Sequence, residues 1–164
     1  MIPFAAHPWN EIVPNLWQGG HYIASTSNDL EVNSSLVTVD DEFDAVYTMA
    51  HAVTKGHGPR SGVDHYTLPL EDSDLITRWQ LLELRRIVSH IVLRVNIGEK
   101  ILIRCEAGYN RSGLVVGMSL LRMGISVFDA CNLIRKNRSI HALSNEYFVQ
   151  LLHEEQDYLA IQNY

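Results

Sequence analysis

Cysteine is scarce in this chain of 164 residues, which contains only Cys105 and Cys131. Two cysteines cannot build the disulfide framework on which many small secreted domains depend. Residues 1–9 also lack the basic segment and the apolar run of a secretory signal peptide. These absences predict a protein of a reducing compartment, the cytoplasm, where a reactive thiol persists.

Long apolar runs and an excess of positive charge are missing as well. No run approaches the roughly 18 residues of a membrane-spanning helix, so no membrane partner is expected. The 19 acidic residues outnumber the 13 lysines and arginines and give a net charge of −6, which argues against a nucleic-acid partner. The length suits one domain with a single core. We expect a short arm over residues 1–10 and one domain over residues 11–164.

The chemically reactive residue types are concentrated in residues 101–113. The apolar run Ile101–Ile103 predicts a buried strand, and residues 112–123 predict a helix that is apolar nearly all round. A strand that leads through a tight loop into a helix N-terminus forms an anion site, because backbone N–H groups converge there and the helix dipole adds about half a positive charge. Cys105 and Arg111 lie on either side of this loop.

These residue types suit phosphoryl transfer. A thiolate is the nucleophilic form of cysteine, and helix N-termini and cations lower a cysteine pKa from about 8.5 to as little as about 3.5–7.5. Arg111 offers a planar fork that binds two phosphoryl oxygens, and Ser112 can donate a hydrogen bond to the sulfur of Cys105. The expected phosphate-binding residues are Glu106, Ala107, Gly108, Tyr109, Asn110 and Arg111. Together they predict a phosphocysteine intermediate.

The segment Cys105-Glu-Ala-Gly-Tyr-Asn-Arg111-Ser112 resembles the Cys-x5-Arg-Ser/Thr signature of the cysteine-dependent phosphatases, and most closely the compact dual-specificity and tyrosine phosphatases. The resemblance covers residues 11–160 and implies that the domain is catalytic and has the phosphotyrosine phosphatase-like fold. The family usually has His before the Cys, where this chain has Arg104. Arg104 either supplies positive charge to the loop or points away on the opposite face of the strand.

A general acid must protonate the leaving oxygen, and in the family this is an Asp on a loop upstream of the Cys. Asp72 and Asp74 are both candidates, with Asp72 ranked first because residues 66–71 resemble the strand that leads to the family's acid loop. Asp74 can instead be read as the N-cap of the following helix. The eight histidines are scattered without the spacing of metal ligands, so neither a metal nor a cofactor is expected.

The remaining pattern predicts an α/β fold, with a central, mostly parallel sheet of four or five strands flanked by helices. We expect strands over residues 11–20, 43–50, 64–70 and 101–103, a long helix that includes residues 81–95, and further helices from residues 112, 126 and 144. The family implies a first helix within residues 21–36, and residues 51–63 indicate a loop. Cys131 lies on an apolar helical stripe and is expected in the core.

The leading functional hypothesis is a phosphatase of protein phosphotyrosine, with phosphoserine and phosphothreonine as further substrates. Its ligands would be a phosphorylated protein and a phosphate- or sulfate-like anion in the loop. One alternative is an RNA 5′-triphosphatase, because Asn110 matches the capping branch of the superfamily, although the acidic net charge opposes it. A phosphoinositide substrate would favour Lys or Arg where the loop has Glu106. Arg104 keeps open a third alternative, a non-catalytic phosphopeptide-binding module.

Overall fold

Short strands separated by turns build the central sheet. The structure, a computed structural model, describes residues 5–24, 34–50 and 58–162. The strands of the main sheet are β1 (Trp9–Val13), β2 (Leu16–Gly20), β5 (Ala45–Thr48), β6 (Asp64–Thr67) and β7 (Ile101–Cys105). Their order is β1-β2-β7-β5-β6, and every pair except β1–β2 is parallel. The predicted α/β fold with a mostly parallel sheet is confirmed.

The N-terminal part of the chain differs from the sequence prediction. Residues 11–20 were expected to form one strand, but they belong to the hairpin of β1 and β2, and β1 already begins at Trp9 within the expected arm. Asn15 turns the chain with a φ of 69°, a left-handed conformation that Asn tolerates better than most residues. Where a first helix was expected, β3 (Tyr22–Ala24) pairs with β4 (Ser34–Leu36). Residues 25–33 lie outside the described ranges.

Four helices follow where apolar stripes predicted them: α1 (Arg78–Asn96), α2 (Arg111–Arg122), α3 (Val127–Asn137) and α4 (Glu146–Gln162). A capping box formed by Thr77 and Gln80 begins α1, so the interpretation of Asp74 as the N-cap is wrong. Ser126 caps α3 as expected, accepting from Asp129 N. α4 begins two residues after the expected Ser144.

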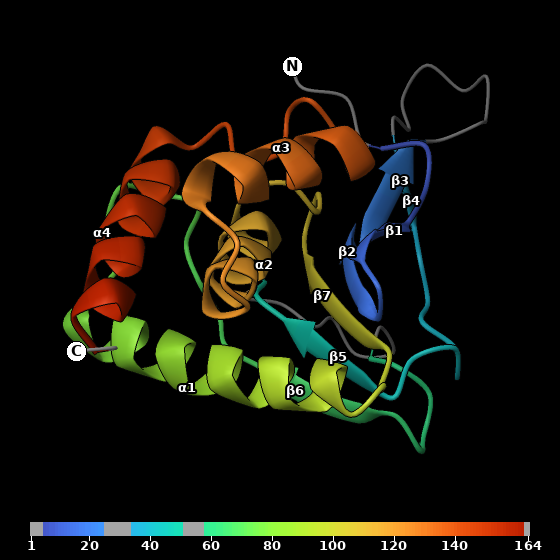
Figure 1. The fold of residues 1–164 in the computed structure, drawn as a ribbon. Helices are drawn as coiled ribbons and strands as arrows, with labels where there is room; N and C mark the ends of the chain where they lie inside the picture. The colour runs from blue at the N-terminus through green and yellow to red at the C-terminus, as the bar shows by residue number, and fades with distance from the viewer. Residues whose placement is uncertain (1–4, 25–33, 51–57, 163–164) are drawn as a thin grey trace.

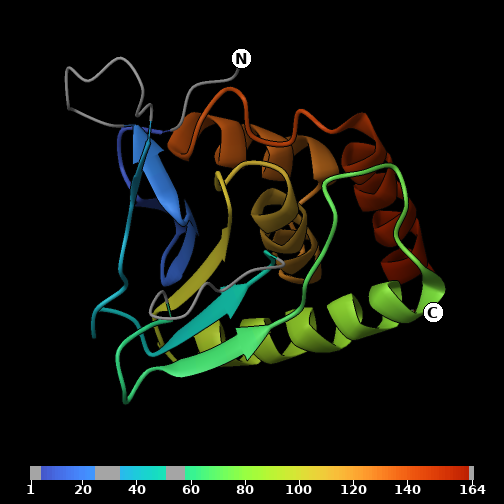
Figure 2. The ribbon, with the colours of Figure 1, turned by 180° about the vertical axis from the view of Figure 1, so that it is seen from behind.

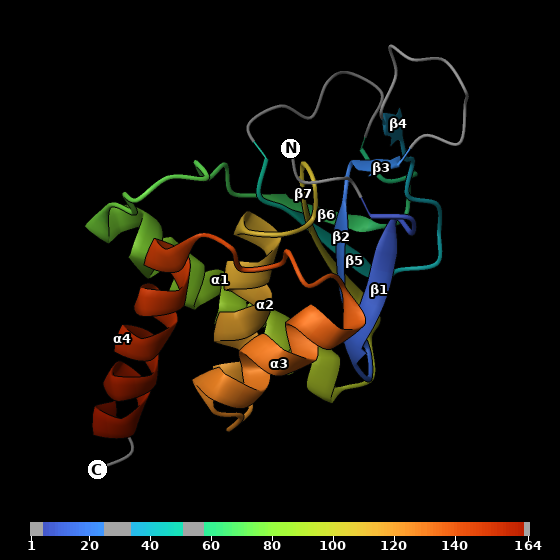
Figure 3. The ribbon, with the colours of Figure 1, turned by 90° about the horizontal axis from the view of Figure 1, so that it is seen from above.

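The helix that follows the loop lies at the centre of the molecule. α2 contacts β2 and β7 of the sheet as well as the other three helices, and Figures 1 and 3 show it surrounded by them. All residues from Ser112 to Leu121 are buried, which confirms the prediction of a helix that is apolar nearly all round. A Cβ at Gly117 would lie 2.8 Å from Leu152 Cδ1, so α2 and α4 approach closely. Cys131 is buried in the same core, as expected.

Alternation along β7 separates the two faces of the sheet. Ile101, Ile103 and Cys105 belong to the large cluster that the helices cover, whereas Leu102 belongs to a smaller cluster with Val39, Phe43 and Val46. Arg104 therefore lies on the face opposite Cys105. In the described parts of the chain, no helix is long and apolar enough to cross a membrane.

The carboxyl ends of the parallel strands meet at one edge of the sheet, which is where ligands bind in open α/β sheets. Two connections pass over this edge: the loop between β7 and α2, and the segment between β6 and α1 (Figure 2). The predicted strand over residues 64–70 ends at Thr67, so residues 68–77 form this second connection. Of the expected loop at 51–63, residues 51–57 lie outside the described ranges.

Candidate active site

The loop between β7 and α2 is packed tightly against the end of β2. His21 N donates to the carbonyls of Cys105 at 2.9 Å and Glu106 at 2.8 Å. Gly108 has a φ of 78°, and a Cβ there would lie 2.5 Å from the carbonyl carbon of Gly19. The position requires glycine for both reasons.

The structure brings the expected nucleophile and its expected hydrogen-bond partner together. Cys105 is the last residue of β7, and Ser112 lies in the first turn of α2. The Sγ of Cys105 is 3.4 Å from the Oγ of Ser112, and both side chains are buried. Asn110 is the N-cap residue of α2, but its side chain makes no cap hydrogen bond. The first N–H groups of the helix are therefore left without a side-chain cap, as an anion site requires.

The guanidinium of Arg111 turns back over the loop and is mostly buried. Its Nη2 lies 3.2 Å from Glu106 Oε2, and its Nη1 donates to the carbonyl of Leu70 at 3.4 Å. Its Nε is buried without a hydrogen-bond partner. An orphaned buried donor is costly, and an anion in the loop would satisfy it.

Asp72 lies beside the loop and is held there by two amides. Its Oδ2 accepts from Asn110 Nδ2 at 3.0 Å, and its Oδ1 accepts from Asn145 Nδ2 at 2.9 Å. Asn145 also donates to the carbonyl of Ser73 at 3.1 Å. These bonds tie the segment before α1 to both the loop and the start of α4. Asp74 is exposed two residues further along.

Two buried polar side chains brace the loop, and sequence reasoning missed the role of both. Gln18 Nε2 donates to the carbonyls of Gly108 at 3.1 Å and Tyr109 at 3.3 Å. Arg138 donates to the carbonyls of Gly108 at 3.1 Å and Ala107 at 3.3 Å, and burial lowers the pKa of Arg138. The available signal was a glutamine at a core-facing position of β2, between Leu16 and Gly20.

Arg104 points away from the loop, which decides between the two alternatives for this residue. Its side chain is fully buried on the opposite face of β7, and its Nε donates to Thr48 Oγ1 at 3.1 Å. Thr48 Oγ1 in turn lies 2.8 Å from His65 Nε2. Burial lowers the pKa of Arg104 to about 10, so it remains charged at neutral pH. Burial, and then the charge of Arg104, lower the pKa of His65.

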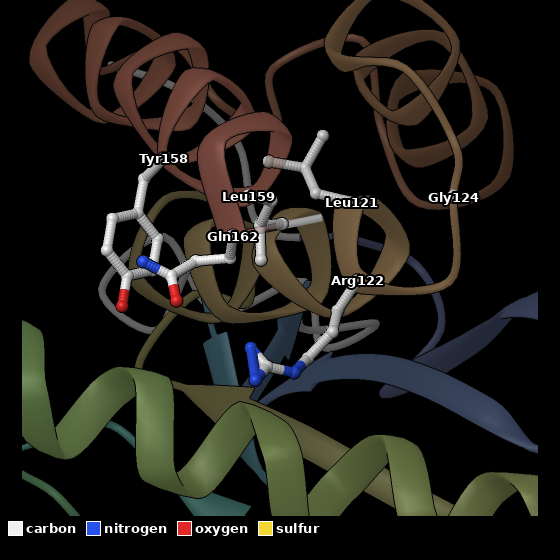
Figure 4. Close-up of a pocket in the computed structure, with 6 residues that line it drawn as sticks. All are labelled: Leu121, Arg122, Gly124, Tyr158, Leu159 and Gln162. Atoms are coloured by element: carbon white, nitrogen blue, oxygen red, sulfur yellow. The ribbon is translucent and has the colours of Figure 1, made fainter. Parts of the chain in front are cut away.

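A separate pocket of about 330 Å³ lies at the far end of α2. Figure 4 shows Tyr158 and Gln162 on α4 beside Leu121 and Arg122 of α2. Because α2 begins at the loop and has 12 residues, its C-terminal end is about 18 Å away. The pocket is therefore distinct from the candidate anion site.

Metal ligands do not gather at the site. Among residues 5–24, 34–50 and 58–162, no three His, Cys, Asp or Glu side chains form a group that could hold a metal ion.

A cysteine at the end of β7, a loop held by buried donors and an arginine in the first turn of α2 thus lie together in one strand–loop–helix unit. The model of the dual specificity phosphatase catalytic domain matches residues 25–157. The chain belongs to this family, which confirms the resemblance noted in the sequence. Family membership implies a phosphorylated substrate.

Solved structures share the fold over nearly the whole chain. Human DUSP28 is 19% identical with a TM-score of 0.74, and the match covers 97% of this chain and 99% of that one. A mouse putative dual specificity phosphatase complexed with zinc tungstate is 22% identical, with a TM-score of 0.74 and coverage of 99% and 95%. The human tyrosine phosphatase-like serine/threonine/tyrosine-interacting protein is 20% identical, with a TM-score of 0.66 and coverage of 95% and 98%. No curated protein sequence matches the chain.

Proposed function

We propose that this domain hydrolyses phosphomonoesters through a phosphocysteine intermediate on Cys105, with phosphotyrosine in proteins as its main substrate and phosphoserine and phosphothreonine as further ones. The observation that carries the proposal is the arrangement of one loop. The loop begins at Cys105, whose Sγ lies 3.4 Å from Ser112 Oγ. It ends at Arg111, whose Nε is buried without a hydrogen-bond partner. Two free, buried cysteines fit a reducing compartment, and we propose the cytoplasm.

In the first step, Cys105 Sγ attacks phosphorus and the bond from phosphorus to the leaving oxygen breaks. Arg111 and the backbone N–H groups of residues 106–111 bind the phosphoryl oxygens. The ion pair of Arg111 with Glu106 does not prevent this, because the Glu106 side chain is 61% exposed and water can solvate its carboxylate when an anion takes its place. Asp72 gives a proton to the leaving oxygen.

In the second step, water attacks the phosphocysteine. Asp72, now a carboxylate, accepts a proton from the water, and the phosphorus–sulfur bond breaks. The electron pair returns to Cys105 Sγ as a thiolate, which the Ser112 hydroxyl stabilises. We propose Asp72 for both proton transfers because Asn110 and Asn145 hold its carboxylate against the loop.

Three substitutions test the mechanism with p-nitrophenyl phosphate. Cys105→Ser should abolish turnover, Arg111→Lys should lower it at least about 100-fold because lysine lacks the bidentate fork, and Asp72→Asn should lower it by at least about 100-fold. Cys131→Ser is the matched control and should retain activity. Turnover by Cys105→Ser would contradict the phosphocysteine proposal. If Asp74→Asn loses activity in place of Asp72→Asn, the acid is Asp74.

A substrate panel separates this function from its alternatives. Phosphotyrosine and phosphoserine peptides test the protein substrate, and release of the γ-phosphate from triphosphate-ended RNA would favour an RNA 5′-triphosphatase. Binding of phosphopeptides without turnover would identify a non-catalytic module. Activity that survives chelation and is blocked by vanadate, a phosphate analogue, would fit the proposed metal-free chemistry.

A further inference from the structure

Gln18 is a fully buried polar residue in the middle of the molecule. It lies on β2 opposite Ile103 of β7, and its amide reaches beneath the loop that follows β7. Its contacts there are with residues some 90 positions along the chain.

The surroundings of Gln18 fix the orientation of its amide. The carbonyl oxygens of Gly108 and Tyr109, at 3.1 Å and 3.3 Å, can only accept hydrogen bonds, so the nitrogen must face them. Its Oε1 is buried without a hydrogen-bond partner. Methionine would fill a similar volume without the cost of an unpaired buried acceptor, so packing alone does not account for glutamine at this position.

The same nitrogen also reaches Ser112. Gln18 Nε2 lies 3.4 Å from Ser112 Oγ, which in turn lies 3.4 Å from Cys105 Sγ. A serine hydroxyl has one proton to donate and two lone pairs that accept. The two N–H groups of Gln18 are shared among three acceptors, so one of them is shared between Ser112 Oγ and a carbonyl oxygen. The hydroxyl cannot donate toward this nitrogen, and once Cys105 is a thiolate, which has no proton of its own to donate, the hydroxyl proton is left for the sulfur.

We propose that Gln18 is a positioning residue that directs the Ser112 hydroxyl proton toward Cys105 Sγ. Within the proposed function, on which this inference rests, the effect belongs to the second step. Water bonds to phosphorus, its proton passes to the Asp72 carboxylate, and the electron pair of the phosphorus–sulfur bond moves to Sγ. A hydroxyl already aimed at that sulfur stabilises the thiolate as it forms.

The test is a double-mutant cycle between Gln18→Met and Ser112→Ala, made in a Cys131→Ser background so that only Cys105 is alkylated. In stopped-flow measurements, the burst of p-nitrophenol reports formation of the phosphocysteine, and the steady-state phase after the burst reports its hydrolysis. The pH profile of iodoacetamide alkylation reports on the thiolate without any turnover. Gln18→Met should slow hydrolysis about 3- to 10-fold, the equivalent of one hydrogen bond, reveal a burst of p-nitrophenol, and shift alkylation to higher pH.

Both effects should be clearly smaller when Ser112 is already alanine, because only the bonds of Gln18 to Gly108 and Tyr109 are then lost. Arg138→Met is the matched comparison, because Arg138 also donates to the Gly108 carbonyl but has no bond to Ser112. Its effect should be the same with serine or alanine at position 112. Equal effects of Gln18→Met in the two backgrounds, or no effect, would overturn the proposal.

One further variant and one further comparison complete the test. Gln18→Glu retains the size of the side chain and replaces the donor with an acceptor, so it should shift alkylation further than Gln18→Met and serves if that variant does not fold. If the wild-type protein turns over no phosphomonoester, the proposed function fails. The alkylation cycle then still decides whether Gln18 acts on Cys105 through Ser112.

Discussion

Gly108 and Gly124 share a left-handed backbone, with φ values of 78° and 88°, but not their surroundings. A Cβ at Gly108 would lie 2.5 Å from the backbone of Gly19, whereas a Cβ at Gly124 would meet nothing within 4 Å. The two positions therefore separate backbone strain from steric collision.

We expect Gly124→Ala to cost about 1 kcal/mol of unfolding free energy and to leave activity intact, because only the left-handed φ is penalised. Gly108→Ala should abolish turnover of p-nitrophenyl phosphate, because the loop must shift as well. Urea unfolding and steady-state kinetics on both variants check this. Full activity of Gly108→Ala would show that the loop tolerates displacement.

At the scale of single residues, the sequence pattern predicted contacts between side chains that are close together in the chain. The distant Asp72 was expected only through the resemblance, and the contacts of other distant side chains were missed. Cys105 and Ser112 could be placed together because only one loop separates the end of the strand from the first turn of the helix. Gln18 and Arg138 could not, because their contact with the loop depends on how β2 and the residue after α3 pack around it. The capping box of Thr77 and Gln80 is visible in the sequence, three residues beyond Asp74, the residue interpreted as the cap.

The segment between β6 and α1 is held by contacts near its middle. Asn145, just before α4, donates to Asp72 and to the carbonyl of Ser73. If Asp72 is the acid, its position depends on this anchor.

We expect Asn145→Ala to lower kcat for alkyl phosphates about tenfold, the cost of roughly one hydrogen bond. The loss should be smaller for p-nitrophenyl phosphate, because its leaving group depends less on protonation than an alkoxide does. Gln150→Ala, whose side chain bonds Glu154 in the same helix, is the control on α4. An equal loss on both substrates would show that Asn145 does not act through the acid.

The stability of the pairing between β5 and β6 should depend on pH through His65, which lies on β6 and bonds Thr48 on β5. His65 has a pKa below its ordinary value of 6.5, because of burial and then the charge of Arg104. The unfolded chain therefore binds the proton more readily, so the stability due to this group is present above about pH 6.5 and is lost as pH falls.

The urea concentration at the unfolding midpoint should decrease when the pH is lowered from about 7.5 to about 5.5. The decrease should be smaller in His65→Gln. Glutamine can keep a hydrogen bond to Thr48 without titrating. His153→Gln, at an exposed position on α4, is the control. An unchanged slope in His65→Gln would assign the pH dependence to other groups.

At the scale of the whole molecule, the order of elements and the parallel sheet could be predicted because apolar periodicity is local. The hairpin at the N-terminus was missed although Pro14 and Asn15, which form its turn, are residue types that favour turns. Contacts between helices were also not predictable, and the ion pair of Arg85 on α1 with Glu155 on α4 is one of them. Arg85 Nη2 lies 2.8 Å from Glu155 Oε2, and Glu155 is 3% exposed.

Glu155→Gln should lower the unfolding free energy by about 3 kcal/mol, because it leaves Arg85 without its counter-charge in a mostly buried setting. Glu154→Gln, exposed on the same helix, should change it by less than about 0.5 kcal/mol. Urea denaturation followed by tryptophan fluorescence measures both. Equal stability of the two variants would mean that the pair contributes nothing to the packing of α1 on α4.

The guanidinium of Arg138 joins the loop to the start of the chain. Of its four acceptors in the described part of the chain, two are the carbonyl of His7 and the Oδ1 of Asn10. Removal of the first ten residues by a protease would take two hydrogen-bond acceptors away from the buried guanidinium of Arg138. The loop between β7 and α2 would then be held less firmly, although none of its own residues had changed. The affinity for inorganic phosphate would decrease as a result.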